Sequence, residues 1–153
     1  MVFSLKNSEK IEIDLAFSAF PEMKLESKID PFLKTILDDS DYWCDEISLW
    51  IKFIEKNVDF LCPDILKKAT SLSMGLNLTD DETIRDLNWR WRKKLETTDV
   101  LAFSAIDGII NLPQDNCLEL GDIIVSVTTA HRQALEQNHG LVMELRWLVS
   151  HGL

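Results

Sequence analysis

Glycine, proline and cysteine are scarce in this sequence of 153 residues, which has five glycines, four prolines and three cysteines. This composition excludes collagen-like and proline-rich low-complexity chains. No stretch approaches the roughly 20 consecutive apolar residues of a membrane span, so we expect no membrane partner. With 46% hydrophobic and 27% charged residues, the chain is typical of one globular domain with a single packed core.

The few cysteines indicate a reducing compartment. Cys44, Cys62 and Cys117 are odd in number and widely spaced, and no apolar signal-peptide segment follows Met1. We therefore expect a cytoplasmic protein. Glycine-rich phosphate loops, the nucleophile elbow and His-Glu-x-x-His are also missing. The sequence thus predicts no catalytic residue, no metal site and no cofactor, and an enzyme is the less favoured interpretation.

Basic residues are outnumbered, with 16 Lys and Arg against 26 Asp and Glu, which gives a net charge of −10. The field of such a molecule repels phosphate backbones and anionic lipid headgroups. We therefore expect no nucleic acid among its partners. One segment departs from this balance, because residues 85–94 hold five basic residues and one acidic residue.

The spacing of apolar residues predicts a mainly α-helical domain, a bundle of five or six helices. Apolar residues recur at helical spacing in residues 41–61, and Pro63 and Gly75 bound a second helix. A capping box at Thr79 and Glu82 starts a third, with Ile84, Leu87, Trp91 and Leu95 on its buried stripe. Further helices are expected over 100–110 and from Ile124 to Val149.

The first residues have a different pattern. Charged and apolar residues alternate over residues 10–15, which predicts a short N-terminal strand. We therefore divide the chain into an extended segment over residues 1–29 and a helical domain over residues 30–153. A competing interpretation takes 100–110 and 120–129 as strands, because the second of these is rich in β-branched residues. The unbroken helical phase as far as Val149 favours helices.

A surface around Trp89 is the first candidate site. Two residues turn a helix by about 200°, so Trp89 lies off the stripe that holds Leu87 and Trp91. Its own face carries Arg85, Arg92 and Lys93. Aromatic and arginine residues are enriched at interaction hot spots, so these four residues are predicted to bind a partner. The alternative is that Trp89 packs inside the protein beneath the cationic stems.

A polar pocket is the second candidate. His131 and Asn138 lie seven residues apart on the apolar stripe of the last predicted helix, and Asp107 is a lone charge in an apolar run. Polar groups in such places need partners, so the three either satisfy one another in the core or line a small site.

We therefore expect a small acidic interaction protein of the inhibitor, immunity or adaptor type, whose partner is another protein. The alternative function is that of a helical domain that binds a small molecule or is an enzyme, with its pocket at Asp107, His131 and Asn138. A homodimer formed through Trp89 is kept as a further alternative.

Overall fold

The computed structural model describes residues 12–19, 36–57, 70–105, 114 and 116–152. The first half of this part contains β1 (Glu12–Ala19), α2 (Ser40–Asn57), β2 (Ser71–Thr79) and α4 (Asp81–Arg92). The second half contains β3 (Val100–Ser104), β4 (Cys117–Ser126), α5 (Val127–Glu136) and α6 (Leu141–Gly152). The described chain is therefore an α/β structure.

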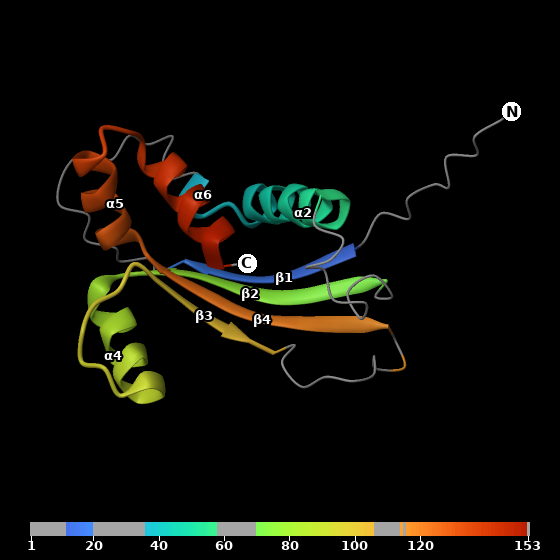
Figure 1. Ribbon diagram of the computed structural model, residues 1–153, viewed down its shortest axis with the longest axis horizontal. Coiled ribbons are helices and arrows are strands. Elements are labelled where there is room, and N and C mark those ends of the chain that lie inside the picture. Colours follow the sequence, from blue (N-terminus) through green and yellow to red (C-terminus); the bar gives the residue numbers. More distant parts are fainter. Residues whose placement is uncertain (1–11, 20–35, 58–69, 106–113, 115, 153) are drawn as a thin grey trace, which may run out of the picture.

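The strands form one mixed sheet in the order β1-β2-β4-β3. β1, β2 and β4 are parallel, and β3 is antiparallel to β4 at the edge. Helices α2, α5 and α6 cover one face of this sheet, whereas α4 lies beside the other face (Figure 1). Most of the second face, under β1 and β2, is left open by the described elements.

The prediction of a mainly α-helical bundle is wrong. β2 falls across the expected end of the second helix, although its buried residues Leu72, Met74, Leu76 and Leu78 alternate with the period of a strand. β4 occupies most of the segment 120–129, and β3 occupies the start of 100–110, as the competing interpretation had it. β1 lies where the alternation predicted a strand and is part of the common sheet. The proposed domain division at residues 29 and 30 falls outside the described residues.

The continuous apolar run of β4 explains why its period was missed. Ile123 and Val125 belong to the main core under the three helices, whereas Ile124 contacts a second cluster with Ile84 of α4 and Leu101 of β3. A strand buried on both faces loses the alternation of apolar and polar residues. The helix then starts at Val127, where the Ser126 side chain accepts a hydrogen bond from the Thr129 N–H.

The main core joins the sheet to α2, α5 and α6. Trp43 and Ile47 of α2 are fully buried, as their spacing predicted, and Ile51 is nearly so. Leu145 and Val149 of α6 are buried in the same cluster. No helix in the described part of the chain is long and apolar enough to cross a membrane.

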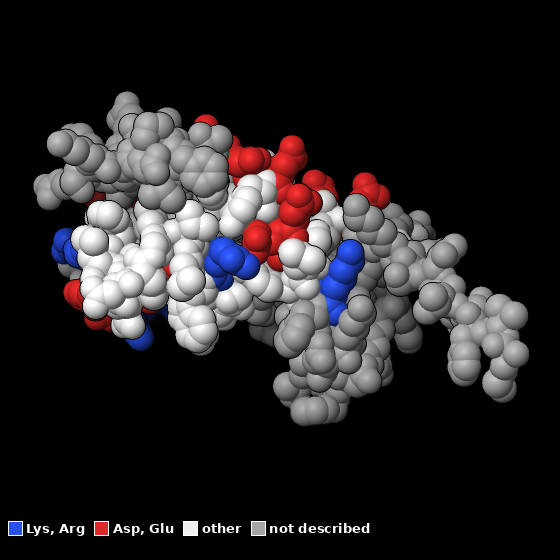
Figure 2. Space-filling view, turned by 90° about the horizontal axis from the view of Figure 1, so that it is seen from above, with Lys and Arg blue, Asp and Glu red and all other residues white. Residues whose placement is uncertain are grey.

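The charges are distributed unevenly over the surface. The view onto the helix-covered face shows acidic side chains gathered near α2 (Figure 2), where Asp38, Asp41 and Asp45 are exposed. The five cations of residues 85–94 belong to α4 and the turn that follows it, beside the opposite face of the sheet. The net charge of −10 is thus a sum that hides the difference between the acidic surface near α2 and the cations at α4.

Candidate functional site

A cavity of about 470 Å³ lies on the open face of the sheet, next to α4. Two rows of residues across the strands form its floor: Ala16, Gly75 and Asp122 are register partners, and so are Ser18, Asn77 and Ile124. Leu76 and Ile123 contribute to the floor, and Trp91 and Phe103 complete the lining. The floor combines small and polar residues, so it leaves room for a ligand above the strands.

Gly75 gives space to the carboxylate of Asp122. A β-carbon at residue 75 would lie 2.1 Å from Oδ1 of Asp122, so any larger residue there would displace this side chain. Among the described residues, no hydrogen bond or ion pair engages the carboxylate, and the side chain is exposed. Asp122 is therefore a charged acceptor that is available to a ligand in the cavity.

An irregularity in β4 sets the position of Asp122. The pairing of β2 with β4 shifts between Ser73 and Met74, so that β4 carries one extra residue, Leu120. Gly121 follows with a φ of 115°, and a β-carbon there would lie 1.8 Å from the carbonyl oxygen of Phe103. Glycine is thus required at the shift, because only it adopts this backbone with β3 so close.

Trp91 and Phe103 form one corner of the cavity, and Arg92 contacts the Phe103 ring outside the lining. The rings of Trp91 and Phe103 meet edge to face with their centroids 6.0 Å apart, and 70% of Trp91 is exposed. The Arg92 guanidinium lies 5.9 Å from the centre of the Phe103 ring and donates a hydrogen bond to the Ala102 carbonyl at 3.3 Å. A cation and two aromatic rings therefore stand together where β3 meets α4.

The predicted surface around Trp89 is divided by the structure. Trp89 is 49% exposed, and Nζ of Lys93 lies 5.8 Å from the centre of its ring. Arg85 is exposed on the same helix, whereas Arg92 is directed to Phe103 and not to Trp89. A partner site at these four residues stays a prediction. Trp91, which the helical pattern assigned to the core, is more exposed than Trp89.

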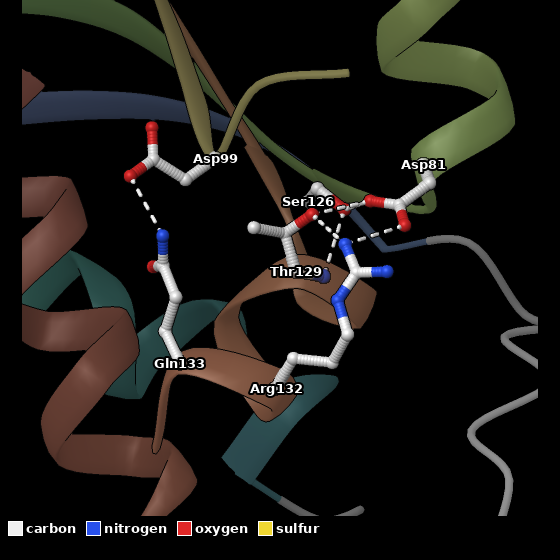
Figure 3. A network of polar contacts seen from close by, with 6 residues as sticks. All are labelled: Asp81, Asp99, Ser126, Thr129, Arg132 and Gln133. Carbon is white, nitrogen blue, oxygen red and sulfur yellow. Dashed lines mark hydrogen bonds and ion pairs between the residues drawn. The ribbon is translucent and has the colours of Figure 1, made fainter. Parts of the chain in front are cut away.

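The start of α4 is held by a network of polar contacts (Figure 3). The Asp81 carboxylate accepts hydrogen bonds from the hydroxyl groups of Ser126 at 2.6 Å and Thr129 at 2.5 Å. Arg132 completes the group with an ion pair to Asp81 at 3.1 Å. Asp80 caps the helix, accepting from the Thr83 N–H at 2.9 Å. The network therefore joins α4 to the junction of β4 and α5, and the helix starts one residue later than the predicted capping box.

A second contact of this kind joins β3 to α5. The Gln133 amide donates to the Asp99 carboxylate at 3.3 Å, and the same carboxylate accepts from the Val100 N–H at 2.8 Å. At its other end, α4 is held by the buried side chain of Asn88, which donates to the Glu96 carbonyl at 2.9 Å. The corner with Trp91 and Arg92 is thus carried by a helix that is fixed at both ends.

The structure describes two of the three residues of the predicted polar pocket. Asp107 lies outside the described residues. His131 is half-buried on α5, whereas Asn138 is exposed in the turn before α6, where its φ is 55°. In the same turn, His139 contacts the buried carboxylate of Glu144. The last segment is thus two helices joined by a turn, and the pocket stays a prediction. No group of three or more potential metal ligands occurs among the described residues.

The sequence interpretation missed the residues of the cavity. Asp122 and Asn77 were not assigned to a candidate site, because their strands were taken for helices or left unassigned. The period-two pattern of residues 71–79 could have revealed β2, and with it the face that Gly75 and Asn77 share. The closeness of Gly75 to Asp122 depends on the pairing of β2 with β4, which no local pattern predicts.

Comparisons with known proteins give consistent matches. A family model described as Endoribonuclease YbeY matches residues 39–153. Endoribonuclease YbeY of Prochlorococcus marinus strain MIT 9313 is 46% identical over 143 residues, covering 94% of this chain and 76% of the relative. The protein of that name from strain NATL2A is 40% identical over 153 residues, covering 100% of this chain and 83% of the relative. A solution structure from Thermotoga maritima matches with a TM-score of 0.48 and 18% identity, over 93% of this chain and 68% of that one.

Proposed function

This chain belongs to the Endoribonuclease YbeY family, and from that premise we propose that it acts on RNA and contacts its substrate at the surface formed by α4 and β3. The relatives carry the name of an enzyme that cleaves RNA internally. The observation that carries the proposal is the placement of Arg92 beside Phe103 and Trp91 at the edge of a cavity.

Family membership corrects two of the predictions made from composition. The expectation of an inhibitor, immunity or adaptor protein is wrong, since the relatives are named as endoribonucleases. Of the two functions considered, the alternative that included an enzyme is the better supported. The expectation that nucleic acid is not a partner is also wrong, because it let the net negative charge of the whole chain outweigh the basic segment 85–94.

The local charge explains how an acidic protein can bind RNA. Charges on the surface are screened over about 8 Å at physiological ionic strength, so a phosphate responds mainly to the side chains near it. Arg85, Arg90, Arg92, Lys93 and Lys94 lie on α4 or directly after it. The acidic residues of α2 lie on the other side of the sheet. An RNA strand that approaches the protein from the α4 side therefore meets these cations before it comes near the carboxylates of α2.

The aromatic residues favour a single strand over a duplex. Bases of unpaired RNA are free to stack on aromatic side chains, whereas those of a duplex are already stacked on one another. Trp91 presents an exposed ring for a base, and the guanidinium of Arg92, the next residue, packs on Phe103 and offers a cation for a phosphate. The surface thus combines the two contacts that single-stranded RNA requires.

The proposal is tested with a labelled single-stranded RNA and a DNA of the same sequence. Binding and cleavage are measured separately on the full chain, and we expect cleavage of the RNA only. Arg92→Ala should weaken RNA binding about fivefold and lower the salt dependence by about one ion, whereas Lys52→Ala on α2 should change it less than about twofold. Equal effects of the two substitutions would contradict the proposed surface. Equal cleavage of DNA would contradict the proposed activity.

A further inference from the structure

We propose that the cavity on the open face of the sheet binds one unpaired RNA base and that the Asp122 carboxylate selects bases with amino groups, guanine above uracil. This inference rests on the proposed function and specifies its substrate. A cavity of about 470 Å³ is within the range of small-ligand sites, roughly 300–1,000 Å³, and suits a nucleotide rather than a duplex.

The charge of Asp122 decides which part of a nucleotide can lie on the floor. A carboxylate repels a phosphate and accepts hydrogen bonds without donating any. The Asp122 carboxylate lies over Gly75, close to the strands, and no described residue forms a hydrogen bond or ion pair with it. The part of the ligand that reaches the floor must therefore carry hydrogen-bond donors and no negative charge, as a base does.

The cations next to the cavity favour the opposite end of the same ligand. The Arg92 guanidinium lies 5.9 Å from the centre of the Phe103 ring, and Phe103 lines the cavity, so Arg92 is the cation that an anionic group beside this wall would meet. A nucleotide is anionic at its phosphate and has donors on its base, so it matches both Asp122 on the floor and Arg92 beside Phe103. A basic peptide would satisfy Asp122, but it would be repelled by Arg92 and the other cations of α4. The arrangement thus favours RNA over a protein segment.

The number of donors ranks the bases. Guanine presents a ring N–H and an amino group side by side, which match the two oxygens of one carboxylate. Cytosine and adenine each offer an amino group, whereas uracil offers only a ring N–H. A paired set of hydrogen bonds discriminates between bases by about tenfold or more. Trp91 adds a stacking surface that every base can use, so it contributes affinity and not selectivity.

The experiment uses RNA hexamers of uridine in which one central position is guanosine, cytidine or uridine, and measures affinity for the full chain by fluorescence anisotropy. We expect the guanosine hexamer to bind about tenfold more tightly than the all-uridine one. Asp122→Asn should reduce this ratio to below about threefold. Glu119→Gln removes the same charge from the same strand outside the cavity lining, and it should leave the ratio unchanged.

A second variant moves the carboxylate without removing its charge. Gly75→Ala places a methyl group where Oδ1 of Asp122 lies, and the end of this exposed side chain can turn aside. The guanosine preference should fall in this variant too. Trp91→Ala should weaken all the hexamers, by a similar factor for each, with partial recovery in Trp91→Phe.

The outcomes separate this inference from the proposed function. Hexamers that bind with equal affinity, or a guanosine preference that survives both Asp122→Asn and Gly75→Ala, would overturn the base site while the RNA-binding surface stands. A lysine- and arginine-rich peptide that binds through Asp122, with RNA binding unchanged in Asp122→Asn, would also overturn it and identify a protein-docking site. Failure of every hexamer to bind at low salt would overturn both proposals.

Discussion

The Asp81 carboxylate accepts a 2.6 Å hydrogen bond from the Ser126 hydroxyl, across 45 residues of sequence. Ser126 is fully buried and is the last residue of β4, and Asp81 is the first residue of α4. The contact therefore fixes the helix that carries Trp91 and Arg92 against the central part of the sheet.

Removal of this carboxylate should destabilise the fold. Asp81→Ala leaves the hydroxyl groups of Ser126 and Thr129 without their acceptor, and hydrogen bonds to charged groups contribute about 1.5–3 kcal/mol. We expect a loss of about 2 kcal/mol in the free energy of unfolding, measured by urea titration. Glu82→Ala, at the next and exposed position, is the control and should cost less than about 0.5 kcal/mol. Equal losses would show that the network contributes nothing to stability.

Gly121→Ala should be one of the most damaging single substitutions in the described chain. The new methyl group would lie 1.8 Å from the Phe103 carbonyl oxygen, on a backbone whose φ of 115° disfavours any side chain. The expected cost is about 3 kcal/mol or more, seen as a lower midpoint of thermal unfolding. Gly140→Ala meets no atom within 4 Å and should cost at most about 1 kcal/mol. Similar midpoints for the two variants would argue against the observed pairing of β3 with β4.

Asn88→Ala should loosen the turn that follows α4. The buried Asn88 amide donates to the Glu96 carbonyl, and no other residue type at this position can form the same contact without a change of length or charge. Trypsin should cut after Lys93 or Lys94 several times faster in this variant. Asp86→Ala, on the exposed side of the helix, is the control for a general effect on α4. Unchanged cleavage in Asn88→Ala would show that the turn is held by other contacts.

Tyr42 provides a titration that can be read directly, because it is the only tyrosine in the sequence. Burial raises the pKa of its hydroxyl group above 10.0, the Glu46 carboxylate raises it further, and Arg146 acts in the opposite direction. The folded state therefore keeps the proton to a higher pH than the unfolded chain does. Above a pH of about 10, this difference makes stability fall as the pH rises.

The tyrosinate absorbance should accordingly rise at a higher pH in the folded protein than in urea. Glu46→Gln should lower the pKa of Tyr42, because it removes the second cause of the shift. Asp45→Asn removes a neighbouring charge that is not among these causes, so it should leave the titration nearly unchanged. A shift of equal size in both variants would point to net charge and not to the Glu46 contact.

Local patterns predicted the helices better than they predicted the strands. The spacing of Trp43, Ile47 and Trp50 placed α2, and the acidic residues after Thr79 placed the start of α4 within one residue. β4 was misread because its residues face two different cores, so that Ile123, Ile124 and Val125 are all buried. The elements that pack on each face of a strand decide which of its residues are buried. A single sequence does not show which elements these are.

The cavity could not be predicted from local sequence patterns either. Its floor is a property of strand pairing, since Gly75 and Asp122 become neighbours only through the shifted register of β2 and β4. The cations of α4 were recognised from the sequence, but their field was averaged with that of distant carboxylates. Trp91 was assigned to the core from the helical period. The helix ends at Arg92, however, and the Trp91 ring is exposed in its last turn.

The cavity wall formed by α4 and β3 has a small apolar cluster of its own, made of Ile84, Leu101 and Ile124 among the described residues. The three helices on the other face share a much larger cluster with the parallel strands. Local opening of the wall therefore exposes less apolar surface than opening of the parallel strands, and requires less free energy. Amide protons of α4 and β3 should exchange with solvent before those of β2.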